Sequence, residues 1–74
     1  GTDMRVGIEA ATALRPTPSA VVVITDGWTP WPDVKTRVPV VACIVGSGAN
    51  DNGVLHSIPS WIIVVKVKEV AFGL

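Results

Sequence analysis

The sequence predicts an α/β fold, the C-terminal part of a doubly wound, mainly parallel three-layer sheet, with one helix followed by three strands. The helix is indicated by apolar residues that recur with a period near 3.6, at Met4, Ile8, Ala11 and Leu14. The strands are indicated by three short runs, residues 20–25, 40–45 and 61–67, that are apolar at both alternating positions. This pattern is typical of parallel strands that are covered on two faces.

The helix is expected over residues 2–14. Thr2 or Asp3 can cap its first amides, and Pro16 cannot continue the helical hydrogen bonds, so the helix should end before it. Gly7 costs about 1 kcal/mol relative to alanine inside a helix. Close packing against the sheet is the reason we expect for a glycine there.

The segments between the strands are predicted to be irregular. Residues 28–39 are rich in proline and have no helical period, so they should form a loop rather than a crossover helix. Residues 46–60 are polar and rich in glycine, with at most one helical turn near residues 54–57. No repeat or domain boundary divides the chain, which we treat as one partial domain over residues 1–74.

One helix cannot cover both faces of three apolar strands. The strand at residues 20–25 is also too apolar for the edge of a sheet. We therefore expect a further element, upstream of this sequence, that pairs with this strand and covers the sheet. An uncovered strand edge would lead to self-association.

The composition excludes several classes of partner. Six basic residues balance six acidic ones in 74 residues, so the net charge favours neither nucleic acid nor an acidic membrane surface. No apolar run is long enough to span a bilayer, and the N-terminus does not resemble a secretory signal. Cys43 is the single cysteine, which excludes an internal disulfide and predicts a buried structural thiol. A cytoplasmic location fits these features best.

Oxygen-bearing side chains should meet at one end of the sheet. Asp26 directly follows the first strand, and ligands of doubly wound sheets bind beyond the carboxyl ends of strands. Thr2 and Asp3 precede a helix that runs antiparallel to this strand, so they should reach the same rim. Such oxygens suit Mg²⁺, Ca²⁺ or Mn²⁺. The alternative is that Thr2 only caps the helix and that Asp26 and Gly27 only turn the chain.

A family resemblance adds to this interpretation. Gly-Thr-Asp at residues 1–3 and Val-Val-Ile-Thr-Asp-Gly at residues 22–27 resemble two pieces of the metal-ion-dependent adhesion site of von Willebrand factor A (VWA) domains. The runs GTDMRVGIEAA and TDGWTPWP are similar to a bacterial VWA-like family of predicted metallopeptidases. The resemblance covers nearly the whole chain and identifies it as the C-terminal part of such a domain.

The resemblance implies specific metal ligands. Thr2 would bind the metal through its hydroxyl, and Asp26 would act as an acidic ligand, usually through water. Asp3 and Gly27 would lie just outside these ligands. The family's first strand carries Asp-x-Ser-x-Ser, which this sequence lacks. With two of five ligands, the isolated chain is expected to bind Mg²⁺, or Ca²⁺ or Mn²⁺, weakly at most.

Other residues give weaker signals. Trp28 and Trp31 flank the rim and could bind a partner, or could pack over the sheet in place of a crossover helix. His56 is the only histidine, without a zinc motif, so an ordinary loop histidine is expected. No serine has a nearby base. The chain is therefore not expected to be an enzyme.

The expected function is metal-dependent protein–protein recognition. The resemblance implies a protein partner such as a MoxR-type ATPase, because bacterial relatives are often associated with these ATPases. Two alternatives stay open. The segment could be a regulatory or docking part of a predicted metallopeptidase, or a structural domain that binds no metal.

Overall fold

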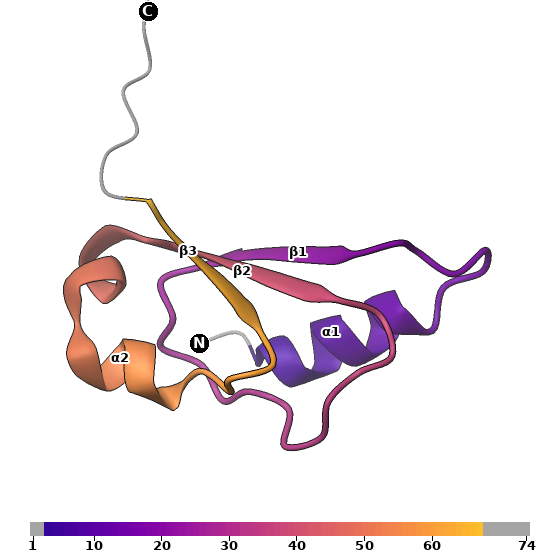
Figure 1. Cartoon of the computed structure of the whole chain (residues 1–74), viewed down its shortest axis with the longest axis horizontal. Helices are drawn as coiled ribbons and strands as arrows, with labels where there is room; N and C mark the ends of the chain where they lie inside the picture. The colour runs from indigo at the N-terminus through magenta and orange to yellow at the C-terminus, as the bar shows by residue number, and fades with distance from the viewer. Residues whose placement is uncertain (1–2, 68–74) are drawn as a thin grey trace, which may run out of the picture.

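The computed structural model describes residues 3–67 and arranges them as a parallel sheet with helices packed beneath it (Figure 1). The elements follow in the order α1 (Met4–Thr12), β1 (Val21–Thr25), β2 (Val40–Val45), the 3-10 helix η1 (Gly46–Asn50), α2 (Asn52–Ser57) and β3 (Ile63–Val67). This order confirms the α/β class and the three predicted strands. α2 extends two residues upstream of the predicted helical turn, and η1 was not predicted.

The sheet has the strand order β1-β2-β3, and both pairs are parallel. Val21 of β1 is paired with Val40 of β2, and Val41 of β2 is paired with Ile63 of β3. β2 is therefore the central strand. Among the described residues, β1 and β3 each have one unpaired edge, including the strand that the sequence predicts to be too apolar for an edge.

One face of the sheet is covered by α1, by α2 and by the loop between β1 and β2, which all lie on the same side (Figure 1). Alternate residues of the strands point to this face, and those of β2 are almost completely buried. They form the core with side chains from the helices and loops. The buried core residues are Ile8, Val21, Trp31, Val38, Val40, Ala42, Ile44, Ala49, Val54, Ile58 and Ile62.

The other face of the sheet is apolar and is not covered by any described residue. The strand register places eight side chains on it, and we call this surface the open face: Val22, Ile24, Val41, Cys43, Val45, Ile63, Val65 and Val67. Ile24 is 70% exposed and Val22 is 60% exposed. Cys43 is only partly buried here, so the prediction of a buried thiol was wrong. The second set of alternating apolar strand residues, which predicts a second covered face, thus lies on a face that none of residues 3–67 covers.

α1 is shorter than predicted and packs through a narrow stripe. Asp3 is its N-cap, as one of the two predicted possibilities, and Ala13 is its C-cap. Ile8 is fully buried, whereas Gly7 is exposed, and no atom outside its own helix and chain neighbours lies within 4 Å of the position of a Cβ added there. The prediction that Gly7 allows close packing against the sheet was therefore wrong.

No helix among residues 3–67 is both long enough and apolar enough to cross a membrane.

Candidate functional site at the carboxyl ends of the strands

The turn after β1 fixes the backbone around Asp26. The hydroxyl oxygen of Thr25 accepts a hydrogen bond of 3.1 Å from the amide of Gly27. Oδ1 of Asp26 accepts one of 3.0 Å from the amide of Trp28. Gly27 has a φ of +87°, which favours glycine. Asp26 therefore occupies an ordered turn with an exposed side chain, as its place after a strand predicts.

Two glycines allow other elements to approach this turn closely. A Cβ on Gly27 would overlap Cγ1 of Val54 in α2. A Cβ on Gly48 of η1 would overlap the backbone carbonyl oxygen of Asp26. Both glycines are buried. The segment after β2 is thus packed directly against the backbone that carries Asp26, and both sites require a residue without a side chain.

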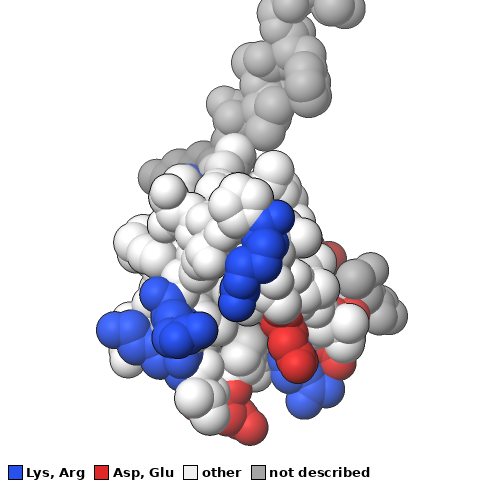
Figure 2. Space-filling model, turned by 90° about the vertical axis from the view of Figure 1, so that its right-hand side faces the viewer, with Lys and Arg blue, Asp and Glu red and all other residues white. Residues whose placement is uncertain are grey.

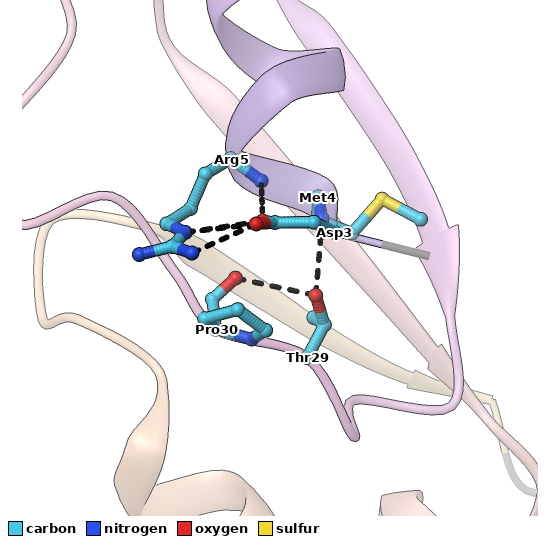
Figure 3. Close-up of polar contacts among 5 residues, drawn as sticks. All are labelled: Asp3, Met4, Arg5, Thr29 and Pro30. Atoms are coloured by element: carbon cyan, nitrogen blue, oxygen red, sulfur yellow. Dashed lines mark hydrogen bonds and ion pairs between the residues drawn. The ribbon is translucent and has the colours of Figure 1, made fainter. Parts of the chain in front are cut away.

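The amino end of α1 contacts the loop that follows β1. The amide of Met4 donates a hydrogen bond of 3.0 Å to the hydroxyl oxygen of Thr29, which in turn donates one of 3.2 Å to the carbonyl of Pro30 (Figure 3). The contact joins residues 25 positions apart. The loop of Asp26 and the start of α1 therefore meet at one rim, as the topology predicts. Thr2 lies outside the described residues.

Asp3 is engaged by its own helix. Its Oδ1 accepts a hydrogen bond of 2.9 Å from the amide of Arg5, and its Oδ2 pairs with Nη2 of Arg5 at 2.8 Å (Figure 3). The hydrogen bonds from the Arg5 side chain, followed by the one from its backbone, lower the pKa of Asp3. Asp3 thus caps α1 in the described structure, and it contributes negative charge near the rim that is largely balanced by Arg5.

The two tryptophans of the loop after β1 have different environments. Trp28 is 60% exposed, whereas Trp31 is 7% exposed and belongs to the core. Trp31 therefore has the packing role that was one of its two predicted possibilities. Trp28 borders a hollow of about 420 Å³ between this loop and α2, which Thr29, Pro30 and Ser57 also line. Only Trp28 of the pair offers most of its side chain to a partner.

The described part of the rim does not by itself hold the ligands of a metal ion. Residues 3–67 contain no group of three or more His, Cys, Asp or Glu side chains that could hold a metal. Asp51, which follows η1, accepts a hydrogen bond of 2.9 Å from the amide of Val54 and caps α2. Hard cations such as Mg²⁺ take about six oxygen ligands. The exposed carboxylate of Asp26 fits such a cation, but other ligands would have to join it.

Some contributors were missed by the sequence reasoning. The close approach of Gly48 to Asp26 is not encoded by any local motif, although a glycine next to a strand end is a signal of tight packing. The contact between Thr29 and α1 could not be predicted from the sequence. The partner of Thr29 is the backbone amide of Met4, and every residue other than proline has such an amide. His56 is exposed in the last turn of α2, as an ordinary histidine would be.

The fold and the rim together define an α/β domain with a parallel sheet whose first strand presents a carboxylate beyond its carboxyl end. Comparisons with protein-family models, curated proteins and solved structures gave no significant match to this chain.

Proposed function

We propose that this chain supplies part of a divalent-metal site through which a VWA-like domain recognises a protein partner. The observation that carries the proposal is the hydrogen bond of 3.0 Å between the amide of Met4 and the hydroxyl of Thr29. It joins the start of α1, next to Thr2 in the sequence, to the loop that follows Asp26. The loop that follows Asp26 is thus in direct contact with the start of α1, which Thr2 precedes in the sequence.

The environment of Asp26 supports a role as a ligand. One carboxylate oxygen accepts a hydrogen bond from Trp28, and among residues 3–67 no other donor reaches the carboxylate. The backbone beneath it is held by the packing of Gly27 and Gly48. An oriented carboxylate loses little conformational freedom when it binds a cation or a cation-bound water. Asp26 is therefore the protein ligand on which the proposal depends most.

The remaining ligands would come from a strand with an Asp-x-Ser-x-Ser motif, which this sequence lacks. Such a strand would pair with the edge of β1 that is unpaired among residues 3–67, because a parallel neighbour of β1 would end at the same rim as Asp26. Helices attached to it could cover the open face. These two bare surfaces support a partial domain, since both are costly in water.

The proposed metal ligands imply how the domain would recognise a partner protein. The metal would keep one open position, which a carboxylate of the partner could fill. Trp28 and the hollow beside it would contact the partner around this carboxylate, since exposed aromatic side chains often anchor interfaces. A MoxR-type ATPase is the partner class that the family resemblance implies.

The experiment is a calorimetric titration of Mg²⁺ into this chain and into a version extended upstream to include Asp-x-Ser-x-Ser. We expect weak or no binding by the chain alone and saturable binding by the extended version. Asp26→Ala should abolish this binding. Asp33→Ala is the matched control, because Asp33 is an exposed carboxylate in the same loop that forms no ion pair with any of residues 3–67. If the extended version folds but binds no Mg²⁺, the proposed metal site is contradicted, and a structural domain that binds no metal becomes the better explanation.

A further inference from the structure

A second candidate site lies at the opposite end of the sheet from Asp26. There the end of α1 and the segments that lead into β1 and β2 border a hollow of about 840 Å³. Its lining includes three basic side chains and one acidic side chain: Arg15, Lys35, Arg37 and Glu9. Figure 2 views this end of the molecule and shows basic side chains gathered on it, with acidic ones beside them. The chain is neutral as a whole, but this hollow has a positive excess.

The three basic groups are not neutralised by the described acidic ones. Among residues 3–67 the single ion pair is that of Arg5 with Asp3, so Arg15, Lys35 and Arg37 have no carboxylate within 4.0 Å. Charges without a protein partner can bind a ligand without first breaking an ion pair. The lining therefore offers positive charge that is available to an anion.

Arg15 is oriented before any ligand arrives. Its Nη1 donates hydrogen bonds to the carbonyl oxygens of Leu14 at 3.0 Å and Ala13 at 3.4 Å, and to the hydroxyl of Thr17 at 3.4 Å. The other guanidinium nitrogens, Nη2 and Nε, make no hydrogen bond to any of residues 3–67. A guanidinium that is already fixed by one edge presents the remaining donors in a defined direction.

Hydroxyl groups divide into two kinds around the hollow. Those of Thr12 and Thr36 donate to backbone carbonyls, at 2.9 Å and 2.7 Å, so their protons are already used. The hydroxyl of Thr17 accepts from Arg15, which leaves its own proton to donate. Ser19 is exposed beside it in the same lining. The hollow thus combines three cations with two hydroxyl donors.

We propose that this hollow binds a phosphate dianion, either free or carried on a small organic molecule. Phosphate accepts several hydrogen bonds at once, and guanidinium, ammonium and hydroxyl donors are the groups that recognise it. The volume is in the range of sites for small ligands, roughly 300–1,000 Å³. Val38, Pro18 and Pro39 add apolar lining, which would contact the organic part of a phosphate monoester.

The test is NMR-monitored titration of the full chain with inorganic phosphate and with phenyl phosphate at constant ionic strength. We expect saturable shifts at Arg15, Thr17 and Arg37, with a dissociation constant of about 1 mM or below. Tighter binding of phenyl phosphate would identify an organic phosphate as the ligand, and equal binding would identify the free anion. Arg37→Gln should weaken binding about tenfold, as expected for the loss of a charge-assisted hydrogen bond.

Two controls make the result decisive. Lys66→Gln removes an exposed positive charge on β3, which is not part of the hollow, so it should leave binding unchanged. An acidic peptide serves as the competing ligand. Equal losses in Arg37→Gln and Lys66→Gln, no saturation by either phosphate, or binding of the acidic peptide alone would each overturn the proposal. Unchanged amide spectra away from the hollow verify that the variants are folded.

Discussion

Gly48 lies against the backbone carbonyl of Asp26 so closely that a Cβ at Gly48 would overlap the carbonyl oxygen. Because Gly48 has no side chain, the segment after β2 contacts the end of β1 directly, and this contact fixes the position of one relative to the other. A backbone carbonyl cannot rotate away as a flexible side chain could. The position of Asp26 depends on this contact as well as on its own turn.

Gly48→Ala should destabilise the fold, because η1 or the turn at Asp26 would have to move. Overpacking of this kind costs about 1–3 kcal/mol, which urea denaturation would measure. Ser47→Ala is the control, since Ser47 is an exposed neighbour in η1. Equal stability of Gly48→Ala and Ser47→Ala would contradict the close contact.

Gly7→Ala should have the opposite effect. Gly7 is exposed in the middle of α1, and a Cβ there has space around it. Alanine stabilises a helix interior by about 1 kcal/mol relative to glycine. The midpoint of thermal unfolding should therefore rise. A lower midpoint would mean that another element packs on this side of α1.

The pKa of Asp3 predicts how acid affects α1. Arg5 lowers this pKa below its ordinary value of 3.8, so the unfolded state takes up the proton at a higher pH than the folded state. The stabilisation is therefore present above about pH 4 and is lost as the pH falls through the folded-state pKa. NMR titration of the Asp3 carboxyl would measure this pKa. Arg5→Gln should bring it back toward the ordinary value, and Arg37→Gln should leave it unchanged.

Cys43 is a reporter of the open face. Its thiol is partly exposed between Ile24 and Val65 in the strand register. A thiol reagent should therefore modify the folded chain at a measurable rate, compared with the urea-unfolded chain as the reference. A version of the chain extended upstream should be modified more slowly if its added elements cover this face. Equal rates for the two folded versions would show that the face stays bare.

The sequence predicted the elements well and their surroundings less well. The helical period placed Ile8, the buried residue of α1, on the predicted apolar face, but Leu14 of the same face lies outside α1 and is 60% exposed. The apolar runs predicted all three strands within a residue or two. The reasons given for Gly7 and Cys43 were wrong, because periodicity states which residues could be buried but not which neighbours are present to bury them. The basic hollow that Arg37 lines was not predicted, because a net charge of zero does not show how the charged side chains are distributed over the surface.

The candidate rim was predicted in part. The placement of Asp26 after a parallel strand, and of the α1 start beside the loop that follows Asp26, follows from topology. The roles of the two tryptophans could not be separated, because both lie in a proline-rich loop without a period. Tertiary packing buries Trp31 and leaves Trp28 exposed, and the pattern of a single sequence does not show such packing.

The edge of β1 that no strand of residues 3–67 pairs with has a consequence for hydrogen exchange. Successive amides of a strand point to opposite neighbours, so only every second amide of Val21–Thr25 is bonded toward β2. The alternate amides should exchange with solvent as quickly as those of a loop, whereas β2 should be protected along its length. If another strand pairs with β1, the alternate amides of β1 should also be protected from exchange. Protection of every amide in β1 would therefore show that such a strand is present.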